Sequence, residues 1–185
     1  LVDRVVTDNF SIIVLMKPNS FNRGLIDSTD ADGNGLQLTI NGSGNIEQSM
    51  GDTTIENNAD LNDGRLHLVQ FDRSGTSMSL YVDGIQRAAT ANISGAPLQA
   101  DSISIGGLLD SSTFDGLIAE VIIFDTVLSD QDRYEINYYL SEKWSIEDIM
   151  DSDGDGYIDT YELDSSSPIN PESGPVHSLK VTIES

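Results

Sequence analysis

A run of twelve residues near the C-terminal end carries carboxylates at the spacing of a calcium-binding loop. The run extends from Asp151 to Glu162, and counting from Asp151 its acidic side chains stand at positions 1, 3, 5, 9 and 12. Gly156 occupies position 6, where such a loop turns sharply with positive φ. The predicted ligands are the carboxylates of Asp151, Asp153, Asp155, Asp159 and Glu162, with the backbone carbonyl of Tyr157.

The alternative interpretation of this segment is a solvated acidic linker. Five carboxylates repel one another in an empty loop, and the full set at matching positions is much less expected by chance than scattered Asp-Gly pairs. Mg²⁺ is disfavoured because it demands a tight octahedron and keeps its waters. The sequence therefore predicts Ca²⁺ as the cofactor.

A second acidic run begins in a similar way but ends differently. Residues 30–35 read Asp-Ala-Asp-Gly-Asn-Gly, yet position 12 of such a loop would be Asn41. Because residues 36–40 alternate apolar and polar side chains like a strand, a polar hairpin turn is the better interpretation of this run.

Catalytic patterns are missing from the sequence. Glu120 and Asp125 are five residues apart, which places them on opposite faces of a strand rather than on one face as paired acids require. His67 and His177 have no cysteine and no ligand pattern for zinc, and we interpret His67 as a structural histidine. We expect a chain that is not an enzyme, although its full-length parent could be one.

The net charge of the chain excludes some classes of binding partner. Its 31 acidic and 9 basic residues give a formal net charge of -22, which repels nucleic acids and anionic membranes. No apolar run reaches the roughly 20 residues of a membrane span, so we predict neither nucleic-acid binding nor membrane insertion. The absence of cysteine excludes disulfides and thiol chemistry. Because the chain opens at Leu1 without a signal-peptide pattern, we interpret it as a piece of a longer protein.

The first 125 residues read as short strands separated by turn signals, which predicts an all-β sandwich or barrel. The expected strands are residues 10–17, 35–41, 66–71, 78–82, 85–87, 102–105 and 117–124. One helix is expected over residues 129–145, with Ser129 as its N-cap. We expect one face of this helix to pack on the sandwich, with Trp144 as a core anchor rather than a ligand platform; this stripe is Ile136, Tyr139, Leu140, Lys143 and Trp144.

Three sequence segments resemble laminin G-like, concanavalin A-like domains. Residues 64–72 followed by 78–84 (Gly-Arg-Leu-His-Leu-Val-Gln-Phe-Asp, then Met-Ser-Leu-Tyr-Val-Asp-Gly) resemble a hairpin of that family. Residues 114–129 resemble its closing strand, and residues 138–144 resemble the helix of bacterial members. The resemblance implies an antiparallel two-sheet jelly roll. Family members usually have more chain before the strand that Phe10 begins, so an early strand is expected to be missing or supplied by residues 179–183.

The acidic loop resembles the thrombospondin type 3-like calcium repeats of secreted bacterial proteins, and the Pro-Ile-Asn-Pro turn at 168–171 fits this resemblance. We therefore expect three parts: residues 1–147 as the laminin G-like sandwich including the helix, 148–174 as an EF-hand-like calcium repeat, and 175–185 as a linker or extra strand.

The sequence is compatible with three functions, and all of them place the chain outside the cell or on a bacterial surface. The first is a calcium-stabilised module of an adhesin or surface protein that binds a glycan or a protein, next to other modules of the same polypeptide. The second is a carbohydrate-binding accessory domain of a secreted polysaccharide-degrading enzyme. The third is a structural spacer without ligand. Candidate aromatic residues at the rim are Phe21, Phe114 and Tyr134.

Overall fold

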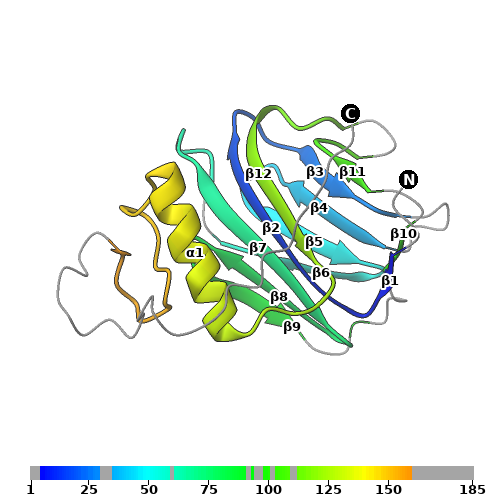
Figure 1. Cartoon of the computed structure of the whole chain (residues 1–185). Helices are drawn as coiled ribbons and strands as arrows, with labels where there is room; N and C mark the ends of the chain where they lie inside the picture. Colours follow the sequence, from blue (N-terminus) through cyan, green and yellow to red (C-terminus); the bar gives the residue numbers. More distant parts are fainter. Residues whose placement is uncertain are drawn as a thin grey trace, which may run out of the picture.

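The computed structural model describes residues 5–29, 35–58, 61–90, 93, 98–100, 103–108 and 112–159. Two five-stranded antiparallel sheets face each other, one in the order β11-β3-β4-β5-β6 and the other in the order β12-β2-β7-β8-β9 (Figure 1). A third, two-stranded sheet pairs β1 with β10. The strands are β1 (Val5–Thr7), β2 (Asn9–Pro18), β3 (Arg23–Asp27), β4 (Leu36–Ile40), β5 (Ile46–Met50), β6 (Thr53–Glu56), β7 (His67–Ser74), β8 (Ser77–Val82), β9 (Ile85–Thr90), β10 (Leu98–Ala100), β11 (Ser104–Ile105) and β12 (Gly116–Phe124).

Strand β2 is buried on both faces and joins two hydrophobic clusters. Phe10, Ile12, Val14 and Met16 point into the core between the two sheets. Their neighbours on the opposite face of the same strand pack beneath the helix, where the second cluster comprises Ile13, Leu15, Leu68, Leu128, Leu140, Ile146 and Met150. Because side chains of a strand alternate between its faces, a strand buried on both sides reads as a continuous apolar run.

Helix α1 (Asp130–Trp144) crosses the outer face of the β12-β2-β7-β8-β9 sheet (Figure 1). The Ser129 Oγ accepts a hydrogen bond from the Asp132 amide, which confirms Ser129 as the N-cap. Ser145 ends the helix in the left-handed region, and its backbone N–H is directed to carbonyls of the last turn.

The prediction of which side chains of α1 pack on the sandwich is wrong in part. Tyr139 is 56% exposed, whereas the buried helix residues are Arg133, Asn137, Leu140 and Ser141. Part of the reason is that some polar side chains on this face have partners in the sheet and the acidic loop. The Arg133 guanidinium lies 3.9 Å from Asp72 Oδ2 in the sheet. Ser141, for example, donates from Oγ to Asp159 Oδ2 at 2.8 Å. Lys143 reaches Glu120 rather than covering the core, and Trp144 is half-buried with its Nε1 donating to the same carboxylate.

The predicted two-sheet jelly roll is confirmed, but several strands were missed. β5 was missed because Gln48 is fully buried between Ile46 and Met50, which hides the alternation of apolar and polar residues. β3, β6 and β10 were not predicted either. A short strand, β1, precedes β2 and pairs with β10. Residues 179–183, expected as a possible source of an early strand, lie outside the described residues, as do all of residues 175–185.

Candidate functional site

The acidic loop follows α1 after a short connection, residues 145–150, and packs against the turn between β8 and β9. The Asp151 amide donates to the Asp83 carbonyl at 3.1 Å, and Asp151 is 2% exposed. Gly84, with φ of 84°, lies against this backbone: a Cβ at position 84 would stand 1.8 Å from the Asp151 carbonyl oxygen. Only glycine permits this contact, so the turn and the loop are fitted to each other.

Three of the predicted ligands come together in this loop. Carboxylate oxygens of Asp151, Asp153 and Asp155 all lie within 4.8 Å of one another. Asp151 Oδ1 accepts from the Gly154 amide at 2.8 Å, and its Oδ2 accepts from the Gly156 amide at 3.0 Å. Gly156 has φ of 96°, the positive value expected at position 6. The backbone therefore turns tightly around a point on which carboxylates converge.

Asp159 is turned away from this group. Its Oδ1 accepts from the Ser152 amide at 2.8 Å, and its Oδ2 accepts from the hydroxyls of Ser152 and Ser141 at 2.7 and 2.8 Å. In this arrangement Asp159 fastens the loop to α1 instead of facing Asp151. Tyr157, the expected carbonyl ligand, has a side chain that is 67% exposed, and its amide donates to Asp155 Oδ1. Glu162 lies outside the described residues.

The electrostatics of the loop favour a cation. Burial raises the pKa of Asp151, and the charges of Asp153 and Asp155 act in the same direction, against the amide hydrogen bonds from Gly156 and Gly154. A bound cation would lower the pKa of Asp151 instead, because it stabilises the ionised carboxylate. The described cluster consists of aspartate side chains, without histidine or cysteine. Carboxylate oxygens are the ligands that Ca²⁺ prefers, so the residues present fit this ion.

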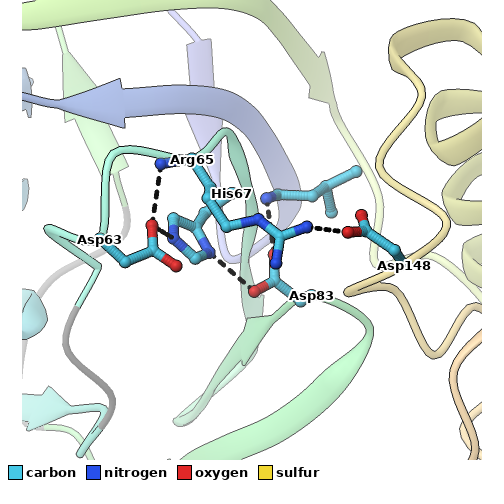
Figure 2. Close-up of polar contacts among 6 residues, drawn as sticks. Asp63, Arg65, His67, Asp83 and Asp148 are labelled. Atoms are coloured by element: carbon cyan, nitrogen blue, oxygen red, sulfur yellow. Dashed lines mark hydrogen bonds and ion pairs between the residues drawn. The ribbon is translucent and has the colours of Figure 1, made fainter.

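A charged network supports the turn beneath the loop (Figure 2). His67 Nδ1 lies 2.8 Å from Asp83 Oδ2, and His67 Nε2 lies 3.0 Å from Asp63 Oδ1. Asp83 Oδ1 also accepts from the Leu68 amide, while Arg65 forms an ion pair with Asp148 just before the loop. His67 is thus satisfied by hydrogen bonds, as expected for a structural histidine.

Asp83 is a supporting residue that sequence reasoning missed. In the sequence, Asp83 and Gly84 form an Asp-Gly pair, which is typical of a turn. The sequence signal was present in that pair, but the contact with Asp151 depends on a segment distant in the chain.

The three candidate rim aromatics come from different parts of the chain. Phe114 is half-buried and packs against the inter-sheet core, and Phe21 is exposed between β2 and β3. Tyr134 lies on α1 beside the acidic loop, where a Cβ on Gly154 would stand 3.5 Å from its hydroxyl oxygen. Glu120 is engaged by Lys143 and Trp144. Residues 30–34 of the second acidic run and His177 lie outside the described residues.

The chain belongs to the concanavalin A-like lectin/glucanases superfamily. The model of the Laminin_G_3 family, which is described by that superfamily name, matches residues 2–132. This match covers the sandwich and the first turn of α1, and it ends before the acidic loop. No curated protein matches the chain in sequence.

Solved structures share the fold at low sequence identity. Domains LG4-5 of the mouse laminin alpha1 chain align with a TM-score of 0.59 and 16% identity, over 70% of this chain and 39% of the laminin chain, well under two thirds of its length. The CBM40 domain of Ruminococcus gnavus IT-sialidase, bound to alpha2,3 sialyllactose, aligns with a TM-score of 0.59 and 17% identity, over 72% of this chain and 83% of that domain.

Domain 4 of AbnA, a GH43 extracellular arabinanase from Geobacillus stearothermophilus in complex with arabinotriose, is also similar. Its TM-score is 0.54 at 15% identity, over 68% of this chain and 64% of that domain. At these identities the likeness concerns the fold alone. Among the described residues, α1 is too short and too polar to cross a membrane.

Proposed function

We propose that this chain is a non-catalytic, calcium-stabilised extracellular binding module. The observation that carries the proposal is the docked acidic loop, in which Asp151, Asp153 and Asp155 converge while the Asp151 backbone rests on Asp83 and Gly84. Calcium would bind to this loop, with Tyr157 and Glu162 completing the ligand set and Asp159 anchoring the loop to α1. Such a loop suits the extracellular space, where calcium is abundant enough for sites with dissociation constants of about 10⁻⁴–10⁻³ M.

The ligand of the module is a glycan or an extracellular protein, and its parent is an adhesin or another surface protein of a bacterium. The fold supports a binding role because laminin domains and carbohydrate-binding domains share it. Residues 148–174 would form a thrombospondin type 3-like repeat that rigidifies the junction to a neighbouring module. Binding of calcium to the folded form stabilises that junction by mass action.

Calorimetric titration of calcium into the purified chain tests the metal site. We expect at least one Ca²⁺ per chain, and calcium at about 100 times its dissociation constant should stabilise the fold by about 2.7 kcal/mol. Asp151→Asn keeps the size and one acceptor oxygen of the side chain but removes the charge. This variant should lose most of the calcium-dependent rise in Tm. In chelator it should show a smaller loss, because Asn can accept from only one of the two amides that bind the Asp151 carboxylate.

Asp52→Asn is the matched control, because Asp52 is exposed in the turn between β5 and β6. It should keep the full calcium response. If the wild-type chain gives no binding heat at millimolar calcium, the proposed metal site is wrong. If Asp151→Asn lowers Tm equally in calcium and in chelator, Asp151 has a purely structural role.

A second candidate function is a carbohydrate-binding accessory domain of a polysaccharide-degrading enzyme. Two structural neighbours favour it, since one belongs to a sialidase and the other to an arabinanase. The sequence flanking the chain in its gene separates the candidates: a glycosidase domain supports the accessory role, and tandem repeats support an adhesin. In either case the pure chain should hydrolyse no polysaccharide, and reproducible turnover would contradict both.

A further inference from the structure

A groove of about 310 Å³ lies where α1, the β8–β9 hairpin and the acidic loop meet. All three parts of the chain line it: Tyr81 and Gln86 from the hairpin, Arg133 and Tyr134 from α1, and Asp151 and Gly154 from the loop. Small-molecule sites have volumes from about 300 Å³ upward, so the groove has room for a small ligand. It lies on the helix-covered side of the sheet, away from the face that packs on the other sheet.

Arg133 forms a rigid base for this groove. Its guanidinium carbon lies 4.4 Å from the centroid of the Tyr81 ring and 5.5 Å from that of Tyr134. The same guanidinium pairs with Asp130 and lies 3.9 Å from Asp72 Oδ2. Its Nε, however, has no hydrogen-bond partner among the residues that the structure describes. This nitrogen is covered by protein atoms, so a ligand in the groove does not reach it. The groove instead offers two tyrosine rings that are already in place around the guanidinium.

The charges of the groove disfavour an anionic ligand. The carboxylates of Asp130 and Asp151 and the net charge of -22 oppose anions, and the charge of Arg133 is already balanced by Asp130 and Asp72. The tyrosine hydroxyls and the Gln86 amide can both donate to and accept from hydroxyl groups, and the carboxylate oxygens can accept from them. Tyrosine also offers apolar surface to a ring with a polar edge. These are the properties of a site for a neutral sugar.

We propose that this groove binds an uncharged sugar residue of a glycan, and that the calcium-ordered loop completes it. The inference rests on the proposed function, because Asp151 and Gly154 form one wall of the groove. Gly154 lies close to the Tyr134 hydroxyl. A movement of the loop on calcium binding would therefore change the surroundings of Tyr134, which lines the groove. Binding free energies are reciprocal, and a sugar held by this wall therefore raises the affinity for calcium by the same factor as calcium raises the affinity for the sugar.

A glycan array of neutral and acidic oligosaccharides in millimolar calcium, followed by calorimetry with cellotriose, xylotriose, arabinotriose and trigalacturonate, tests this inference. We expect a neutral oligosaccharide to bind and trigalacturonate not to bind. Removing calcium with chelator, Tyr134→Ala and Gln86→Ala should each weaken binding by about tenfold or more, since each removes a wall or a hydrogen-bonding group. Tyr134→Phe should weaken binding less, because the ring remains.

Tyr139→Ala is the matched control, since Tyr139 lies on α1 but is exposed and does not line the groove. This variant should bind the sugar as the wild type does. No binding of any neutral saccharide, equal binding with and without calcium, or unchanged binding by Tyr134→Ala overturns the inference. A parallel calcium titration separates the two proposals. If the chain binds calcium but no sugar, only the proposal of a sugar site in the groove is wrong. If it binds no calcium, the proposal of a calcium-stabilised loop is wrong.

Discussion

At the scale of single residues, His67 carries a pH-dependent charge and is hydrogen-bonded to Asp83 in the turn that supports the acidic loop. Carboxylates accept hydrogen bonds, so His67 can donate to both Asp83 and Asp63 only when both ring nitrogens carry protons. Burial by itself lowers the pKa of His67, but the hydrogen bonds and charges of Asp83 and Asp63 outweigh it and raise the pKa above its ordinary value of 6.5. The protonated ring is therefore the form that the fold prefers.

This preference predicts a pH dependence with a definite sign. A histidine with a raised pKa contributes its full stabilisation below its unfolded pKa and loses it as pH rises through its folded pKa. The difference in unfolding free energy between wild type and His67→Gln should therefore be larger near about pH 6 than near about pH 9. Urea unfolding at both pH values in chelator measures it.

Asp63→Asn is the control for this experiment, because it removes one of the two carboxylates and leaves Asp83 in place. It should reduce the pH dependence without abolishing it. A wild-type advantage over His67→Gln that grows at high pH would contradict a charged His67 in the folded chain.

At the scale of elements, the β8–β9 turn and the acidic loop depend on a glycine at position 84. Gly84→Ala adds a methyl group at a backbone with φ of 84° and places it 1.8 Å from the Asp151 carbonyl oxygen. We expect a loss of about 1 kcal/mol from the left-handed backbone alone, and a further loss because the loop must move. Calcium affinity, measured by titration, should fall as well.

Gly64→Ala provides the matched control. Gly64 has φ of 81°, and nothing lies within 4 Å of a Cβ at this position. This variant carries the same backbone cost without the clash, and its calcium affinity should be unchanged. If both variants lose equal stability and bind calcium equally, the contact between turn and loop has no role in the site.

At the scale of the whole molecule, the cluster beneath α1 joins the sheet, the helix and the segment that leads into the acidic loop. Leu140 contributes from the helix, Leu15 and Leu68 from the sheet, and Met150 from the residue before Asp151. The expected boundary between residues 147 and 148 therefore runs through a packed cluster in the described part of the chain. We infer that the sandwich, α1 and residues up to 159 unfold together.

Leu140→Ala tests this cooperativity. Leu140 is fully buried, and its truncation should cost about 2–5 kcal/mol through lost burial and the cavity left behind. Circular dichroism follows the sheets, and the fluorescence of the single tryptophan, Trp144, follows the end of α1. Both signals should shift to lower urea together.

Tyr139→Ala, on the exposed side of the helix, should change stability little. An early fluorescence transition in Leu140→Ala, with the dichroism transition unchanged, would show that α1 folds separately from the sandwich.

The sequence alone determined the features that local physics encodes. Apolar runs and turn residues located β2, β4, β7, β8 and β12, and a capping hydroxyl located the start of α1. The spacing of acids and glycine pointed to the segment at Asp151, where Asp151, Asp153 and Asp155 do lie close together; calcium binding there stays a prediction. In each case the signal lies within a few residues, because strand alternation, caps and tight turns depend on neighbouring torsions and side chains.

Only the tertiary structure decided which distant residues meet. The polar buried face of α1, the contact of Gly84 with Asp151 and the turn of Asp159 toward Ser141 all depend on partners far apart in the chain. Where a buried polar residue has a specific partner, as Ser141 has in Asp159, long-range packing rather than local periodicity sets that partner. For the same reason the groove between helix, hairpin and loop, which three separate segments build, was visible only in the folded chain.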